Sequence, residues 1–135
     1  MATESRHVSV SVDRPAAAVY DYASQPANLP QWAPGLASTV EQIDGRWVAH
    51  SPMGRVAFAF APRNEFGVLD HDVMLPSGDV VHNPMRVIGD GDRCEVVFTV
   101  RRRPGMTDAD FAADAAAVAV DLGTLKRLLE HRPLP

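Results

Sequence analysis

The chain has 135 residues, 46% hydrophobic and 22% charged, and these values are typical of one globular domain over residues 1–135. Its formal net charge of −4 argues against a nucleic-acid partner. A single cysteine, Cys94, excludes a disulfide within the chain. The N-terminus shows no hydrophobic signal region and no apolar run reaches the length of a membrane span. We therefore expect a cytoplasmic protein with no integral membrane segment.

The beginning of the chain predicts one strand and two short helices. Residues 7–12 alternate between valine and polar side chains, which is the pattern of a half-buried strand. The Asp-Arg-Pro sequence at 13–15 marks a helix start, so a short helix is expected over residues 15–24. Residues 26–32 predict a second short helix or turn, because their prolines prevent one continuous helix.

From residue 36 the hydrophobic pattern has a period of two and predicts six further strands in a meander. Turn sequences separate these strands, among them Asp44-Gly45 and the stretch at 89–92. With the first strand they make an antiparallel sheet of about seven strands, and with the helices an α+β fold. The six expected strands are 36–43, 46–51, 55–61, 64–75, 80–88 and 94–101.

Residues 107–131 predict one long amphipathic helix. Thr107 can cap its start, and Asp110 sits three residues later, as in a capping box. The helix is long enough to cross a small sheet, so its apolar stripe must be buried on that sheet. Asp110, Asp114 and Asp121 form a neighbouring flank that is expected to be solvated. The stripe consists of Phe111, Ala115, Val118, Leu122, Leu125 and Leu129.

Three local motifs accompany this order of elements. They are Val12-Asp13-Arg14-Pro15 leading to Val19-Tyr20-Asp21-Tyr22, then Asn28-Leu29-Pro30-Gln31-Trp32, and finally Asp121-Leu122-Gly123-Thr124-Leu125-Lys126. With these motifs the chain resembles the START-like superfamily, also called SRPBCC or Bet v 1-like, and within it the polyketide cyclase/dehydrase group. The resemblance implies a helix-grip fold, in which a curved antiparallel sheet surrounds the long C-terminal helix. It also implies a cavity between sheet and helix for a hydrophobic ligand.

Strand alternation places His71 and Asn83 on the sheet face that should meet the helix, where polar groups can orient a ligand. Each also has a structural interpretation, His71 as a satisfied core histidine and Asn83 as an amide beside a proline. The small Ala115 and Ala119 either leave ligand space or simply favour helix. The resemblance puts Trp32 near a cavity entrance, with core packing as the alternative. The candidate ligand-binding residues are Trp32, Phe58, Phe60, His71, Asn83, Met85, Phe98, Ala115, Val118 and Ala119.

The first functional hypothesis is a binder of a hydrophobic small molecule that is lipid-like, aromatic or polyketide-like. The alternative is an enzyme of the cyclase, aromatase or dehydratase type, in which His71 is the candidate catalytic acid–base group. A third is a regulatory protein-interaction domain. No motif predicts a metal site or a cofactor, and we expect a monomer or a homodimer. The sequence leaves the ligand and the strand phases of Trp47 and His50 open.

Overall fold

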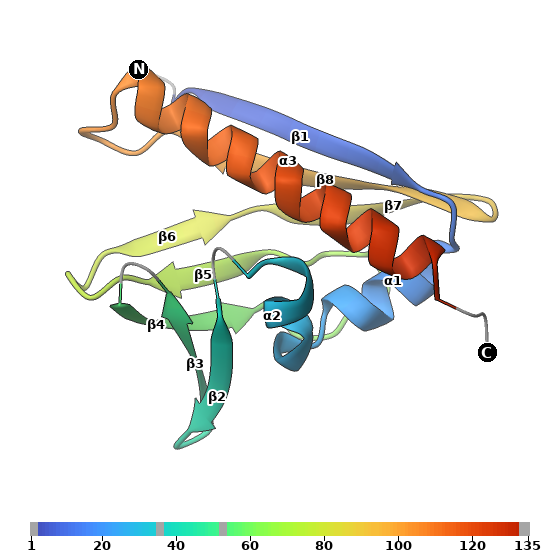
Figure 1. Ribbon diagram of the computed structural model, residues 1–135, viewed down its shortest axis with the longest axis horizontal. Coiled ribbons are helices and arrows are strands. Elements are labelled where there is room, and N and C mark those ends of the chain that lie inside the picture. The colour runs from blue at the N-terminus through green and yellow to red at the C-terminus, as the bar shows by residue number, and fades with distance from the viewer. Residues whose placement is uncertain (1–2, 35–36, 52–53, 133–135) are drawn as a thin grey trace.

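The computed structural model describes residues 3–34, 37–51 and 54–132, and Figure 1 shows a long helix lying across a curved sheet. The predicted start of the second strand at residue 36 lies outside the described residues. The elements, in chain order, are β1 (Ser5–Val12), α1 (Ala16–Ala23), the short 3-10 helix η1 (Pro26–Asn28), α2 (Leu29–Trp32), β2 (Thr39–Ile43), β3 (Arg46–Ser51), β4 (Gly54–Phe60), β5 (His71–Met74), β6 (Val80–Asn83), β7 (Met85–Asp90), β8 (Arg93–Arg101) and α3 (Asp108–Glu130).

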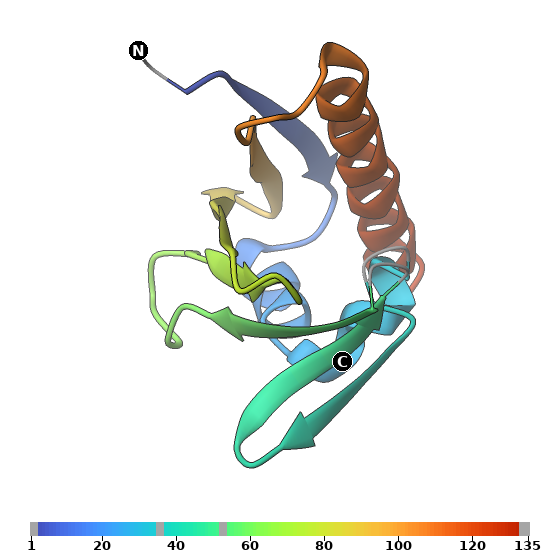
Figure 2. The same ribbon diagram turned by 90° about the vertical axis from the view of Figure 1, so that its left-hand side faces the viewer.

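The strands form a three-stranded sheet, β1-β8-β7, and a five-stranded sheet, β2-β3-β4-β5-β6, with antiparallel pairing throughout. The two sheets meet where the chain before β5 runs beside β7. Leu69 N donates to Met85 O at 2.9 Å, and Val87 N donates to Gly67 O at 2.9 Å. Figure 2 shows the resulting curve, from β1 (blue) beside α3 to the β2–β3 hairpin (teal). The predicted helix-grip fold is confirmed.

The strand predicted at 80–88 is two strands, so the described part of the chain holds eight rather than about seven. Pro84 separates β6 from β7, and β6 pairs with β5 whereas β7 pairs with β8. Proline has no N–H to continue a ladder, and its carbonyl accepts a hydrogen bond from Thr99 N at 2.9 Å instead. The break allows one continuous segment to belong to both sheets.

The strand predicted at 64–75 is wrong over its first half, where the chain forms a turn. The Oδ1 atom of Asn64 accepts hydrogen bonds from Phe66 N and Val68 N, both at 3.0 Å. These side-chain bonds replace ladder bonds and hold a compact turn. Gly67 has φ +71°, and a Cβ there would lie 2.2 Å from Val87 O, so the close approach to β7 requires glycine.

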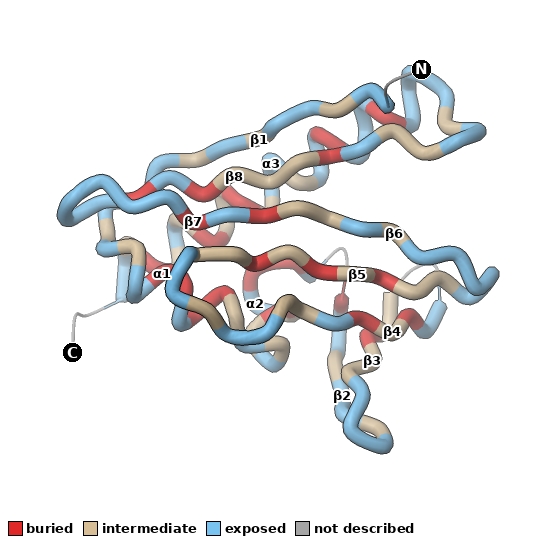
Figure 3. Tube along the Cα trace, turned by 180° about the vertical axis from the view of Figure 1, so that it is seen from behind, coloured by how far each residue is buried: buried red, intermediate tan, exposed pale blue. Residues whose placement is uncertain are grey.

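Helix α3 is capped as predicted and buries the predicted stripe. Asp110 N donates to Thr107 Oγ1 at 3.0 Å, and Thr107 N donates to Asp110 Oδ2 at 3.2 Å. The helix packs against β1, β8 and α2. In the stripe only Val118 is half-buried, and the other five residues are buried. Figure 3 shows buried positions alternating with more exposed ones along β7 and β8, which also contribute to the core.

Candidate functional site

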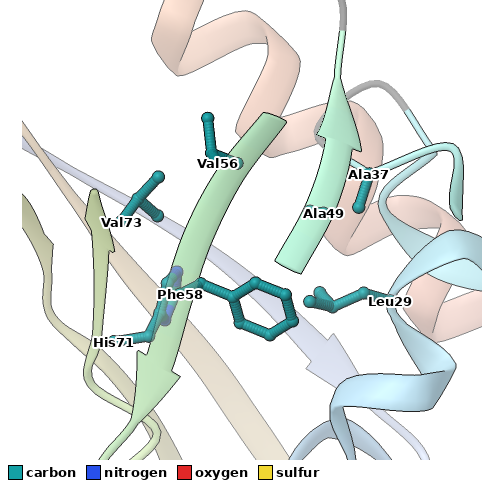
Figure 4. Close-up of a pocket in the computed structure, with 7 residues that line it drawn as sticks. All are labelled: Leu29, Ala37, Ala49, Val56, Phe58, His71 and Val73. Atoms are coloured by element: carbon teal, nitrogen blue, oxygen red, sulfur yellow. The ribbon is translucent and has the colours of Figure 1, made fainter. Parts of the chain in front are cut away.

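A small apolar cavity lies between the five-stranded sheet and α2. Its volume, counted as the space that the centre of a water-sized sphere can occupy, is about 10 Å³. This is about the smallest volume that can hold one water molecule. Side chains therefore fill nearly all of this interior. In Figure 4 the ring of Phe58 on β4 points towards Leu29 on α2. The lining residues are Leu29, Ala37, Ala49, Val56, Phe58, His71 and Val73.

His71 is the polar residue of this lining, and its side chain is held in one tautomer. The residue is only 6% exposed, and its Nδ1 lies 3.0 Å from Leu69 O. Because a carbonyl oxygen can only accept, Nδ1 carries the proton in the neutral ring and Nε2 is an acceptor. Among the described residues Nε2 has no hydrogen-bond partner. The structural interpretation of His71 as a satisfied core histidine therefore holds for one nitrogen only.

Burial determines the charge of His71. Desolvation lowers the pKa of its imidazole, and the opposing contributions of the Leu69 carbonyl and of Asp70 are smaller. The ring is therefore neutral around pH 7. A neutral histidine with a free Nε2 can accept a hydrogen bond or take a proton from a bound molecule.

Aromatic side chains run in a line through His71 along the concave face of the sheet. Ring centroids are 6.4 Å apart for Trp47 and Phe58, 6.1 Å for Phe58 and Phe60, 5.1 Å for Phe60 and His71, and 5.6 Å for His71 and Phe98. This places Trp47 on the concave face and settles its strand phase. Trp47, Phe60 and Phe98 are only half-buried, so the apolar interior extends to a partly exposed rim.

His50 lies on the opposite face of β3 from Trp47. Its Nε2 atom is 2.9 Å from Glu41 Oε1 on β2, and the side chain is 41% exposed. Asp70 and Asp72 likewise lie away from the cavity, as alternation predicts. Asp72 Oδ1 is 2.7 Å from Nδ1 of the exposed His82, and Asp70 forms an ion pair with Arg86. These side chains of the outer face therefore pair with one another.

The ten predicted ligand-binding residues occupy different depths. Phe58 and His71 line the cavity, whereas Ala119 is exposed on α3, so the structure does not bring it to the interior. Asn83 is half-buried and pairs directly with His71 across β5 and β6, which places both on one face. The others are buried outside the lining (Trp32, Met85, Ala115) or half-buried (Phe60, Phe98, Val118).

Three lining residues carry no clear sequence signal. Leu29 and Ala37 belong to the segment around α2, whose docking on the sheet cannot be derived from a four-residue helix. Ala49 alternates with Trp47 on β3, and the phase of that strand was open. Once Trp47 is known to face inward, Ala49 must do so as well.

Trp32 brings an unpaired donor to the same layer. It is 4% exposed, and its Nε1 is a buried atom with no hydrogen-bond partner among the described residues. Leaving such a donor unsatisfied costs about 1–3 kcal/mol. Trp32 follows Leu29 by three residues on α2, so both lie on one face of that helix. Among the described residues, Trp32 Nε1 is the buried side-chain polar atom that lacks a partner.

Asp121 corrects the prediction that all three aspartates of the α3 flank are solvated. Asp110 and Asp114 are exposed, but Asp121 is half-buried, and burial raises its carboxyl pKa to about 6. Among the described residues Asp121 has no ion-pair or hydrogen-bond partner. Asp121 and Leu128 are seven residues apart, about two helical turns, so their side chains leave α3 in nearly the same direction. Leu128 borders a groove together with Gln31 of α2. Asp121 is therefore on the flank of α3 that faces α2.

Other chemistry finds little support in the described residues. Within 3–34, 37–51 and 54–132 no three His, Cys, Asp or Glu side chains are grouped to hold a metal ion. Cys94 is 3% exposed, and burial raises its thiol pKa, which disfavours the nucleophilic thiolate. No helix in the described ranges is long and apolar enough to span a membrane.

Comparison with solved structures identifies the class of fold. The aromatase/cyclase Zhui from Streptomyces sp. R1128 superposes with a TM-score of 0.75 at 16% identity, over 97% of this chain and 96% of that chain. A truncated norcoclaurine synthase from Thalictrum flavum gives 0.69 at 15% identity, over 98% and 96%. A START superfamily protein from Mycobacterium smegmatis gives 0.67 at 13%, over 96% and 98%. At these identities the likeness establishes the START-like fold.

The sequence identifies the family within that class. A family model described as polyketide cyclase / dehydrase and lipid transport matches residues 4–130, and the chain belongs to this family. The predicted resemblance is therefore confirmed. A search of curated proteins found no match.

Proposed function

We propose that the protein binds a hydrophobic small molecule between its five-stranded sheet and its helices. The observation that carries this proposal is the cavity itself, whose surface is apolar and which is lined by side chains from α2, β3, β4 and β5, one of them a neutral histidine. Nε2 of this histidine has no hydrogen-bond partner among the described residues. Sites of this composition bind apolar ligands and orient them through a few polar atoms. The family's description as cyclase, dehydrase and lipid transport agrees with such a ligand.

Binding requires the interior to open. The cavity of about 10 Å³ is far smaller than the several hundred Å³ of ordinary ligand sites. The half-buried rings of Trp47, Phe60 and Phe98 border the interior and are less constrained than the core. We expect the ligand to displace such rings and to replace their mutual contacts with its own.

The test changes the volume of the cavity in both directions. Nile red, an uncharged apolar dye, reports uptake by its fluorescence. Ala49→Leu fills the cavity and should weaken uptake at least about tenfold, whereas Val73→Ala enlarges it and should strengthen uptake. Ala59→Leu is the matched control, because Ala59 is exposed on the other face of β4. Thermal melts verify that each variant is folded, and equal uptake by Ala49→Leu and Ala59→Leu contradicts the proposed site.

A second candidate function is supported by the same free Nε2 of His71. A neutral imidazole in an apolar site can serve as a general base, which is typically worth about 10²–10⁴ in rate. An enzyme of the cyclase or dehydratase type would then act on the bound molecule. Turnover by the parent with polyketide-like substrates, lost in His71→Gln while binding survives, supports the enzyme. Unchanged turnover in His71→Gln removes His71 from that role.

A further inference from the structure

We propose that the ligand is a neutral molecule whose hydroxyl group donates a hydrogen bond to Nε2 of His71, and that carboxylates of the same shape are rejected. This inference rests on the proposed binding function and names the class of ligand. It follows from the fixed direction of one acceptor and from the distribution of charge around it.

The acceptor is fixed because the His71 ring is held on several sides. Leu69 O accepts the Nδ1 proton at 3.0 Å, and the rings of Phe60 and Phe98 lie against the imidazole at 5.1 and 5.6 Å. A flip of the ring would lose the Leu69 bond in a buried site, which is costly. Nε2 is the ring nitrogen farther from the backbone and keeps its lone pair. The surface of the closed cavity is apolar, so a guest reaches this lone pair only when the interior opens. A hydroxyl group of the ligand can donate a hydrogen bond to this lone pair.

No cation compensates a buried anion here. The described residues that line the cavity include neither lysine nor arginine. The nearby Arg86 is an outer-face residue that pairs with Asp70. A carboxylate would lose its hydration without gaining a partner and would face the lone pair of Nε2. Protonation of His71 could supply a partner, but burial opposes it.

The donor of Trp32 is compatible with an uncharged, oxygenated ligand. Its Nε1–H is buried without an acceptor among the described residues, and α2 presents Trp32 on the same face as the cavity-lining Leu29. A hydroxyl, ether or carbonyl oxygen can accept from this group. Such an oxygen contributes polarity without the desolvation cost of an ionised group.

The test compares three probes with one ring system: 2-naphthol, 2-methylnaphthalene and 2-naphthoate. Calorimetric titration at about pH 7.5 keeps the acid ionised and the phenol neutral. We expect 2-naphthol to bind about five- to tenfold more tightly than 2-methylnaphthalene, as one net hydrogen bond predicts. We expect 2-naphthoate to bind at least about tenfold more weakly than 2-methylnaphthalene, because its charge stays unpaired.

His71 variants assign the preference to Nε2. His71→Leu should retain 2-methylnaphthalene binding and lose the advantage of 2-naphthol, whereas His71→Gln, which keeps an acceptor oxygen, should recover part of it. His82→Gln is the control, because His82 is an exposed histidine on the outer face. Tight binding of 2-naphthoate, or an unchanged 2-naphthol preference in folded His71→Leu, overturns the inference alone. Failure of all three probes to bind overturns the proposed function and this inference together.

Discussion

The two sheets of this fold are covered in different ways, and under the proposed function this difference separates stability from binding. α3 lies along β1 and β8, and there Leu122 and Leu125 are 1% and 0% exposed. Polar contacts fasten the same side, since Lys126 Nζ donates to Ser11 O at 2.6 Å. The region between α3 and the three-stranded sheet is therefore closely packed by apolar side chains and is also held by hydrogen bonds.

On the concave face of the five-stranded sheet, by contrast, two polar side chains have atoms without hydrogen-bond partners among the described residues. The cavity lies here, and the free Nε2 of His71 and the unpaired Nε1 of Trp32 belong to this side of the molecule. Its aromatic rings are only partly buried at Trp47 and Phe60. A protein that must hold its fold while admitting a guest can divide these tasks, with one sheet packed by a helix and the other left adaptable.

The largest expected effect breaks the packed side. Leu125→Ala or Leu122→Ala removes a fully buried side chain from α3 and should lower the free energy of unfolding by about 2–5 kcal/mol in urea melts. Val120→Ala on the same helix is the control, because Val120 is 66% exposed and should change stability by less than about 0.5 kcal/mol. Losses at Leu122 and Leu125 as small as that of the control contradict the docking of α3.

A smaller effect is expected on the flank of α3 that faces α2. The folded-state pKa of Asp121 is raised to about 6 from 3.8, so the folded state retains its proton more strongly. The associated stability is complete below about pH 4 and is lost as pH rises through 6. Because Asp121 is half-exposed, Asp121→Asn should stabilise the protein at about pH 8 by no more than roughly 1 kcal/mol and have little effect near pH 4.

The matched variant for this experiment is Asp114→Asn, two turns earlier on the same flank. Asp114 is exposed, so its replacement should change the free energy of unfolding by less than about 0.5 kcal/mol. Urea melts of the parent and both variants across this pH range check the prediction. Identical pH profiles for Asp121→Asn and the parent would show that Asp121 is solvated like Asp114.

The last effect concerns His71 and has the opposite sign with pH. Burial lowers the pKa of His71 below its ordinary 6.5, so below that pH the unfolded chain binds a proton that the folded chain refuses. Stability is therefore lost as pH falls below 6.5 towards the folded-state pKa. His71→Gln should flatten this part of the profile in urea melts. A slope as steep in His71→Gln as in the parent contradicts the buried neutral ring.

The features that could be predicted from the sequence are those whose signals are local. The capping box of Thr107 and Asp110 and the stripe of α3 follow from helical spacing, and both are confirmed. The Asp44-Gly45 turn is also confirmed, with φ of +52° and +78° at its two residues. Alternation correctly directed Phe58 and His71 to the concave face.

Other features were less predictable because they depend on contacts between distant segments. The break at Pro84 and the turn held by Asn64 redirect strands that alternation alone would continue. The depth of Ala119 and Asp121 depends on which neighbours flank α3, and a helical stripe does not specify them. Leu29 reaches the cavity only through the docking of α2 on the sheet.

The most direct test of the account is nuclear magnetic resonance of the histidine side chains during titration with 2-naphthol. In the free protein the account predicts that Nδ1 of His71 is protonated and that Nε2 is not. On binding, the Nε2 resonance of His71 should shift as it accepts a hydrogen bond, while the resonances of His82 stay in place. A protonated Nε2 in the free protein, or an unchanged His71 spectrum at saturating 2-naphthol, would contradict the account.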